Sequence, residues 1–299
     1  MPQDIYIGLD GGGTKSKLVM RDAAGNLLGS GRAGPANICL SVEVALRSLA
    51  EALEQALDAA KIKLHPEEHR LHLGLGLAGT EMQPARHEFL ARLPHFATVR
   101  LESDAYAACL GAHEGQDGAI LIIGTGIVGY RVALKQEKRV SGWGFPHDDV
   151  GGGAWLGLHA LRYTLEWLDG RRDSSIFLDA IYAAFQNSTM TLIAWANQAT
   201  ALEYATLAPI FTHFLVQGDR WAIELAQRSG AALSLVITAL LKEHPTLPLC
   251  LFGGLASFIE PYLQTKNMIN IVPRKQDATE GALLLVRNTV KNSMCFSYN

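Results

Sequence analysis

The stretch DGGGTK, residues 10–15, decides our interpretation of this chain. It follows the apolar run Ile5–Leu9 and precedes a second strand-like run at 15–20, so we expect it to form the tip of a tight β-hairpin. Glycines let a strand turn back because they tolerate positive φ, but such a turn needs only one or two of them. Here three glycines are followed by Thr14 and Lys15. Converging backbone N–H groups, a hydroxyl and an ammonium group are all donors to an anion, so the stretch predicts a phosphate-binding loop.

Asp10 adds a carboxylate at the end of the first predicted strand. Magnesium prefers oxygen ligands and keeps much of its water shell in proteins. We therefore expect Asp10 to hold Mg²⁺, through water, beside the bound phosphate.

The layout of the first strands is repeated from residue 118 onward. A buried run at 119–123 leads into a second glycine turn, GTG at 124–126, and a returning strand at 130–134. Such repetition predicts a duplicated domain with a cleft between the two copies. We place the first domain at 1–115 and the second at 116–299. The second carries a helical insertion at about 151–244, and its last helix is free to pack back on the first domain.

Three other glycine patterns do not have the context that their motifs require. Residues 74–79 and 124–129 both match G-x-G-x-x-G, but a strand follows the second and the helix after the first is delayed to about Pro84. A dinucleotide fingerprint needs its last glycines to open a helix. Residues 8–15 resemble a Walker A loop, yet Thr14 stands where that motif requires lysine. The patterns therefore favour neither a Rossmann site nor a P-loop.

Composition excludes several other classes of protein. The 299 residues carry a formal net charge of −3 without a basic stripe, which argues against a nucleic-acid binder. No signal peptide and no apolar segment of about 18–20 residues is visible, so we expect a cytoplasmic protein that does not bind membranes. The four cysteines, Cys39, Cys109, Cys250 and Cys295, are too widely spaced for a zinc site or a disulfide framework.

These motifs carry a family resemblance. Residues 10–15 resemble the first phosphate motif of the sugar kinase/hsp70/actin superfamily, 124–126 its second, and FGG at 252–254 its adenosine motif. Their order and spacing agree over essentially the whole chain, and the best match is the BadF/BadG/BcrA/BcrD-type group, which contains N-acetylglucosamine kinases and bacterial glucosamine kinases. The resemblance implies an α/β fold of two ribonuclease-H-like (actin-like ATPase) domains flanking a central cleft, with ATP and Mg²⁺ as cofactors. The implied ATP and phosphate ligands are Gly11, Gly12, Gly13, Thr14, Lys15, Gly124, Thr125, Gly126, Gly253 and Gly254.

Asp104 is the expected catalytic base. It stands where a predicted strand becomes a helix, a position at which aspartate also commonly serves as a helix cap or first-turn residue. Phosphoryl transfer to a hydroxyl needs a carboxylate near the proton of the nucleophile. In the resembled kinases an aspartate followed by small residues at this helix start is the base, and Asp104 matches it.

A glycine-rich segment at 142–151, GWGFPHDDVG, is expected to bind the sugar. A tryptophan between glycines offers a flat apolar face, although the alternative is an aromatic of the core. Asp149 can accept hydrogen bonds from adjacent hydroxyls. The segment resembles the Gly-Trp-Gly…Asp-x-Gly motif of N-acetylglucosamine kinases at Gly142, Trp143, Asp149 and Gly151. Asp148 stands where the family has a glycine directly before the aspartate.

Asn37 completes the expected sugar site. It follows Gly34-Pro35 on a loop, where asparagine is usually a turn residue. In the resembled kinases an asparagine after this Gly-Pro contacts sugar hydroxyls, and Asn37 matches it.

The resemblance implies ATP-dependent 6-phosphorylation of N-acetylglucosamine, with glucosamine as the nearest alternative. The expected partner is a small-molecule sugar, and the family allows a homodimer. One rival is a BadF-type ATPase without sugar kinase activity, which activates a dehydratase through an iron–sulfur cluster, but the cysteines lack a cluster-ligating spacing. Another is a non-catalytic nucleotide-binding regulator, against which the presence of Asp104 argues.

Overall fold

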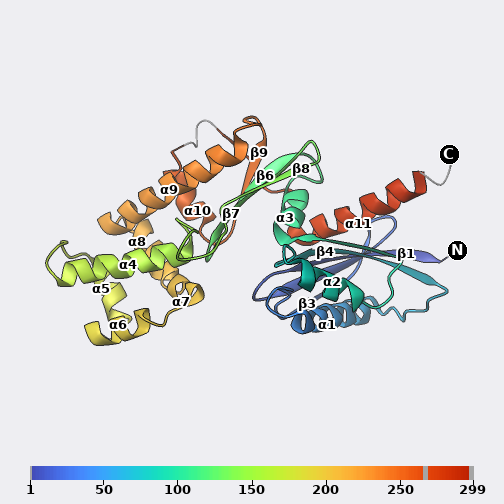
Figure 1. The fold of residues 1–299 in the computed structure, drawn as a ribbon, viewed down its shortest axis with the longest axis horizontal. Coiled ribbons are helices and arrows are strands. Elements are labelled where there is room, and N and C mark those ends of the chain that lie inside the picture. Colours follow the sequence, from blue (N-terminus) through green and yellow to red (C-terminus); the bar gives the residue numbers. More distant parts are fainter. Residues whose placement is uncertain (1, 265–268, 296–299) are drawn as a thin grey trace. The chain divides into compact units, whose positions relative to one another are not determined.

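The computed structural model describes residues 2–264 and 269–295, and the chain divides into two compact units (Figure 1). Unit 1 comprises residues 1–118 and 273–299, and unit 2 comprises residues 119–272. The C-terminal segment thus groups with unit 1, whereas the boundary expected from the sequence counted it in the second domain and left its last helix free to pack back on the first. None of the helices within the described ranges combines the length and the apolar character that a bilayer crossing requires.

Unit 1 is built on a five-stranded sheet in the order β3-β2-β1-β4-β5. Its strands are β1 (Gln3–Gly11), β2 (Ser16–Asp22), β3 (Leu27–Ala33), β4 (His69–Leu77) and β5 (Thr98–Ser103). The first three strands pair antiparallel, while β4 pairs parallel with β1 and β5 parallel with β4. The predicted hairpin is confirmed, because Gly11 pairs with Ser16 and leaves residues 12–15 as the turn.

Helices cover both faces of this sheet (Figure 1). They are α1 (Val42–Ala60), α2 (Gln83–Ala91), α3 (Asp104–Ala112) and α11 (Ala278–Cys295). Glycines let the backbones approach closely. A Cβ on Gly31 of β3 would lie 2.0 Å from the Ala52 carbonyl oxygen of α1, and one on Gly74 of β4 would lie 1.9 Å from the Ala282 carbonyl oxygen of α11. Side chains larger than glycine would therefore separate these helices from the sheet.

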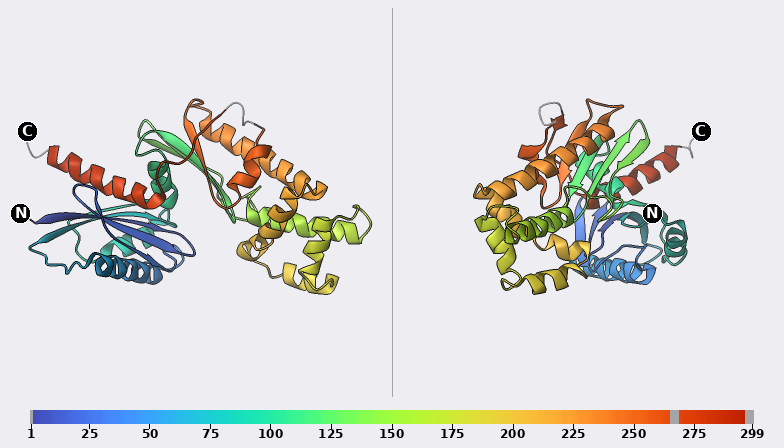
Figure 2. Two further views of the ribbon diagram at one scale, coloured as in Figure 1. Left: turned by 180° about the vertical axis from the view of Figure 1, so that it is seen from behind. Right: turned by 60° about the vertical axis from the view of Figure 1, so that its left-hand side comes forward.

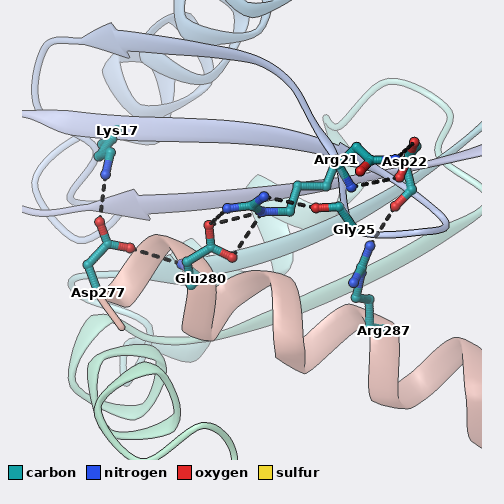
Figure 3. A network of polar contacts seen from close by, with 8 residues as sticks. Lys17, Arg21, Asp22, Gly25, Asp277, Glu280 and Arg287 are labelled. Carbon is teal, nitrogen blue, oxygen red and sulfur yellow. Dashed lines mark hydrogen bonds and ion pairs between the residues drawn. The ribbon is translucent and has the colours of Figure 1, made fainter. Parts of the chain in front are cut away.

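Ion pairs tie α11 to the hairpin strand β2 (Figure 3). The Lys17 Nζ lies 2.5 Å from Asp277 Oδ2, and Arg21 pairs with Glu280. The second carboxylate oxygen of Asp277 accepts a hydrogen bond from the Glu280 N–H at 3.1 Å, which caps the start of the helix. The last helix is thereby fixed to the strand that follows the predicted phosphate loop.

Unit 2 repeats the sheet order of unit 1. Its sheet runs β10-β9-β6-β7-β8, so the hairpin strands again lie at one side and later strands join the other. The strands are β6 (Gly118–Ile123), β7 (Ile127–Ala133), β8 (Gln136–Val140), β9 (Pro248–Phe252) and β10 (Asn270–Ile271). Strand β9 pairs parallel with β6, as β4 does with β1. The duplication predicted from residues 118–134 is thus present in the sheet topology.

A block of helices separates β8 from β9 in the sequence, as predicted for about 151–244 (Figure 2). The block contains α4 (Gly153–Leu168), α5 (Ile176–Ala183), α6 (Thr189–Ala196), α7 (Ala201–Ala205), α8 (Ala208–Val216) and α9 (Arg220–Leu241), and α10 (Ala256–Ile259) follows β9. Buried side chains of the block and of the sheet form one core cluster, which includes Leu121, Leu156, Phe211 and Leu233. The helices thus belong to unit 2 as an integral part of its core.

Candidate functional site

The tip of the first hairpin does not use its glycines in the way the sequence indicated. We predicted positive φ at the glycine turn, and this is wrong, because none of Gly11, Gly12 and Gly13 has a left-handed backbone. The loop between β1 and β2 spans residues 12–15, which is wide enough to turn without it. A Cβ on Gly11 would lie 2.6 Å from another Cβ of the unit, whereas one on Gly12 or Gly13 meets nothing within 4 Å. The last two glycines therefore leave open space beside the backbone.

The backbone of this open tip has donors to offer. The loop is held by a hydrogen bond from the Ala36 N–H to the Gly12 carbonyl at 2.9 Å. Residues 13–15 are exposed, and within 2–264 and 269–295 no group accepts a hydrogen bond from the N–H of Gly13 or Thr14. Adjacent N–H groups without an internal acceptor are suited to bind an anion.

Carboxylates gather behind the tip. Burial first, and then the nearby charges of Asp104 and Asp277, raise the pKa of Asp10 to about 6 against the opposing charges of Lys17 and Lys15. The predicted metal residue and the predicted base are thus neighbours. A cation would relieve this crowding of negative charge. Among the described residues no three His, Cys, Asp or Glu side chains are arranged to hold a metal directly.

Asp104 is the first residue of α3 and not its cap. The N-cap is Ser103, whose Oγ accepts a hydrogen bond from the Tyr106 N–H at 3.1 Å. Asp104 accepts one from the next N–H, that of Ala105, at 2.8 Å. A carboxylate in the first helical turn is stabilised by the helix dipole. Ser103 is therefore the cap and Asp104 the first-turn residue that the structural alternative also allowed, with a half-buried, oriented carboxylate.

The second glycine turn, in unit 2, packs against Asp149. A Cβ on Gly126 would lie 2.3 Å from Asp149 Oδ2, so only glycine fits beside this carboxylate. Asp149 has a φ of 62° and its Oδ1 accepts a hydrogen bond from the Ile127 N–H at 3.4 Å. Burial raises the pKa of Asp149. One residue predicted to bind sugar and one predicted to bind phosphate therefore meet in this unit.

A pocket of about 350 Å³ opens next to this turn. It joins the predicted residues Gly124, Thr125 and Gly254, which come from two segments far apart in the sequence. Gly253, next to it, has a φ of 95°, which requires glycine. The remaining lining residues, which the sequence analysis missed, are Gly153, Ala205, Ala208, Pro209, Thr212, Leu255 and Phe258. Most belong to helices or their ends, where apolar periodicity indicates burial and gives no sign of a ligand.

The loop that holds Gly142 and Trp143 presents the indole to solvent. Trp143 is 76% exposed, so the alternative of a core aromatic is excluded. The Arg139 guanidinium lies over its ring, 5.0 Å from the centroid. Gly142 and Gly144 on either side have φ of 82° and 99°. This part of the loop needs its glycines for the backbone conformation.

Asn37 is a turn residue with spare donors. Its Oδ1 accepts hydrogen bonds from the N–H groups of Cys39 at 3.0 Å and Leu40 at 3.2 Å. Elsewhere in the described part of the chain, nothing accepts a hydrogen bond from its Nδ2, which therefore remains available to a ligand.

The predicted site residues form two groups: residues 10–15, 37 and 104 in unit 1, and 124–126, 142, 143, 149, 253 and 254 in unit 2.

Known proteins resemble this chain over almost its full length. The glucosamine kinase GspK of Vibrio cholerae is 37% identical over 283 residues, which cover 94% of this chain and 95% of that protein. The N-acetylmuramic acid/N-acetylglucosamine kinase of Clostridium acetobutylicum is 26% identical over 303 residues, 94% of this chain and 98% of the relative.

A solved structure shares the fold. It comes from Chromobacterium violaceum, where it is described as a candidate N-acetylglucosamine kinase. It is 30% identical with a TM-score of 0.85, over 94% of this chain and 98% of the other. The two mixed five-stranded sheets and this likeness confirm the predicted α/β fold with two ribonuclease-H-like domains. The model of the BadF/BadG/BcrA/BcrD ATPase family matches residues 7–286, and the chain therefore belongs to that family.

Proposed function

We propose that this protein is an ATP-dependent kinase that transfers the γ-phosphate of ATP to the 6-hydroxyl of an amino sugar. The observation that carries the proposal is the proximity of Asp10 and Asp104 behind an open, donor-bearing glycine tip. In a member of this ATPase family, that arrangement would serve as a phosphate site with a carboxylate that can take up a proton in the same unit.

ATP would be bound by the glycine segments of both units. We assign Gly11, Gly12, Gly13, Thr14 and Lys15, together with Gly124, Thr125 and Gly126, to the phosphates. The 350 Å³ pocket beside Gly254 suits the adenosine, because Leu255, Phe258 and Pro209 offer apolar walls to a nucleobase. Gly253 and Gly254 let the backbone come close to it.

Asp10 would hold Mg²⁺ through water. When bound, the ion neutralises charge that develops on the transferred phosphoryl group. The residues around Asp10 fit this role, because its own carboxylate is crowded by two others and balanced by two lysines.

Asp104 would act as the base. The 6-hydroxyl oxygen of the sugar forms a bond to the γ-phosphorus while the bond from that phosphorus to the bridging oxygen of ADP breaks. The hydroxyl proton passes to the Asp104 carboxylate. Its position in the first turn of α3 holds the carboxylate in one orientation before the proton arrives.

The sugar would be bound by Asn37, Gly142, Trp143 and Asp149. The exposed indole offers an apolar face, Asn37 Nδ2 offers donors and the Asp149 carboxylate offers acceptors. N-acetylglucosamine is the substrate we propose first. Glucosamine is the second candidate, and the 37% identity to a glucosamine kinase gives it comparable support.

A 6-deoxy sugar tests the position of transfer. ADP formation should rise with N-acetylglucosamine or glucosamine and should not rise with the 6-deoxy analogue of the better substrate. Asp104→Ala should abolish the rise, while Asp179→Asn, an exposed aspartate in the first turn of α5, should keep it. Stimulation by the 6-deoxy sugar would contradict transfer to the 6-hydroxyl.

A further inference from the structure

The loop at residues 139–149 of unit 2 is held in a strained conformation. Ser141 has a φ of 64°, in the left-handed region that residues other than glycine occupy only where their surroundings hold them. Gly142 and Gly144 follow with positive φ. A chain segment of this kind, with an exposed tryptophan at its tip, needs contacts that select one conformation.

Arg139 holds the loop from one side. Its Nε donates a hydrogen bond to the Ser141 carbonyl at 3.2 Å, and its Nη2 donates one to the Gly142 carbonyl. The same guanidinium lies over the Trp143 ring. One side chain from the end of β8 thus fixes both the backbone of the loop and the orientation of the indole.

Asp148 holds the loop from the other side. The Ser141 Oγ, which lies 2.9 Å from Asp148 Oδ1 and 2.8 Å from Oδ2, shares its one proton between them, and the Trp143 N–H donates a hydrogen bond to Oδ2 at 3.0 Å. Its own N–H donates to the Gly144 carbonyl at 2.9 Å. The Asp148 carboxylate therefore links Ser141 and Trp143 within the loop, and both of its oxygens accept a hydrogen bond from the loop.

We infer that Asp148 is a positioning residue that fixes Trp143 for the sugar, an inference that rests on the proposed function. Its carboxylate is occupied by the loop, so it acts through Trp143 and not by direct contact with substrate. A tryptophan already held in one conformation loses less conformational entropy when a ligand binds against it. These hydrogen bonds to the Asp148 carboxylate, which we call the clamp, should therefore affect sugar binding and leave the chemical step unchanged.

The test compares three variants. Asp148→Ala removes every acceptor of the clamp, and Asp148→Asn keeps one oxygen that can accept the Trp143 N–H. The matched control is Asp22→Ala, because Asp22 clamps the β2–β3 turn in the same way, through hydrogen bonds from the Asn26 N–H and Nδ2, both at 2.8 Å. For each variant we would measure KM for sugar, KM for ATP and kcat.

We expect Asp148→Ala to raise KM for the sugar about tenfold with kcat and KM for ATP within twofold of wild type. Asp148→Asn should recover most of the loss, and Asp22→Ala should match wild type. An unchanged sugar KM in Asp148→Ala would overturn the inference. A fall in kcat together with a rise in KM for ATP would also overturn it, because those changes indicate a general structural defect.

A second readout does not depend on activity. The chain has five tryptophans, so fluorine NMR of fluorotryptophan-labelled protein should give a resonance for Trp143 that Trp143→Phe identifies. In Asp148→Ala this resonance alone should shift and broaden. If the wild-type protein turned over no sugar, the proposed function would fail, and a Trp143 resonance unchanged in Asp148→Ala would separately refute the clamp.

Discussion

Replacing Gly12 by alanine should weaken ATP use without weakening the fold. The new Cβ would meet no heavy atom within 4 Å, and the residue has no left-handed φ that alanine would strain. The free energy of unfolding should therefore change by no more than about 0.5 kcal/mol. The same methyl group would stand in the open space where we propose that a phosphate approaches the backbone.

The expected loss of activity follows from that displacement. Misplacing a reacting group by about 1 Å can cost about a hundredfold in rate, which corresponds to about 2.7 kcal/mol of transition-state stabilisation. Gly12→Ala should thus lower kcat/KM for ATP by about that factor.

Gly11→Ala provides the contrast. Its Cβ would lie 2.6 Å from the Ala36 Cβ and 2.8 Å from Leu77 Cδ2, so this variant should lose about 1–3 kcal/mol of stability. Urea unfolding and ADP formation, measured on both variants, separate the two effects. A Gly12→Ala protein with wild-type kcat/KM for ATP would refute the assignment of this tip to phosphate binding.

Three further predictions follow from single contacts. Asp104→Asn should lower kcat by about 10²–10⁴-fold while ATP still binds in calorimetry, and full activity would exclude it as the base. Gly281→Ala should destabilise unit 1 by about 1–3 kcal/mol in urea unfolding, because its Cβ would lie 1.8 Å from the Ala107 carbonyl oxygen; an unchanged midpoint would contradict this packing. Burial alone would raise the pKa of Asp4, but hydrogen bonds from His72 and Arg70, with the charge of Arg70, hold that pKa below its usual value. This stabilisation is complete above the unfolded pKa and is lost as pH falls through the folded one, so Asp4→Asn should flatten the acid side of a stability profile, and an unaltered profile would contradict the pairing.

Alternation and glycine spacing predicted the strands that carry the site. Apolar runs separated by glycines identified β1, β2, β6 and β7, because each of these strands has at least one apolar, buried face. Strand β8 was not predicted, since Gln136–Val140 is polar and lies at the edge of its sheet. Strand β10 has only two residues, too few for a periodic signal.

The site shows a similar limit. The glycine motifs located Gly124, Thr125 and Gly254 of the pocket, but they could not locate Thr212, which α8 brings there through tertiary packing. Asp277 also escaped notice, because its pairing with Lys17 spans 260 positions in the sequence. The positive φ expected at the first glycine tip was wrong, since composition does not distinguish a tight turn from a wider loop.

The most direct test of the central claim is ADP formation by the purified protein with Mg²⁺ and one sugar at a time. The panel would contain N-acetylglucosamine, glucosamine, N-acetylmannosamine, glucose and no sugar, each with wild type and with Asp104→Ala. We predict strong stimulation by one amino sugar and its loss in the variant. ATP hydrolysis that is indifferent to every sugar would contradict the proposed kinase activity and favour an ATPase of another kind.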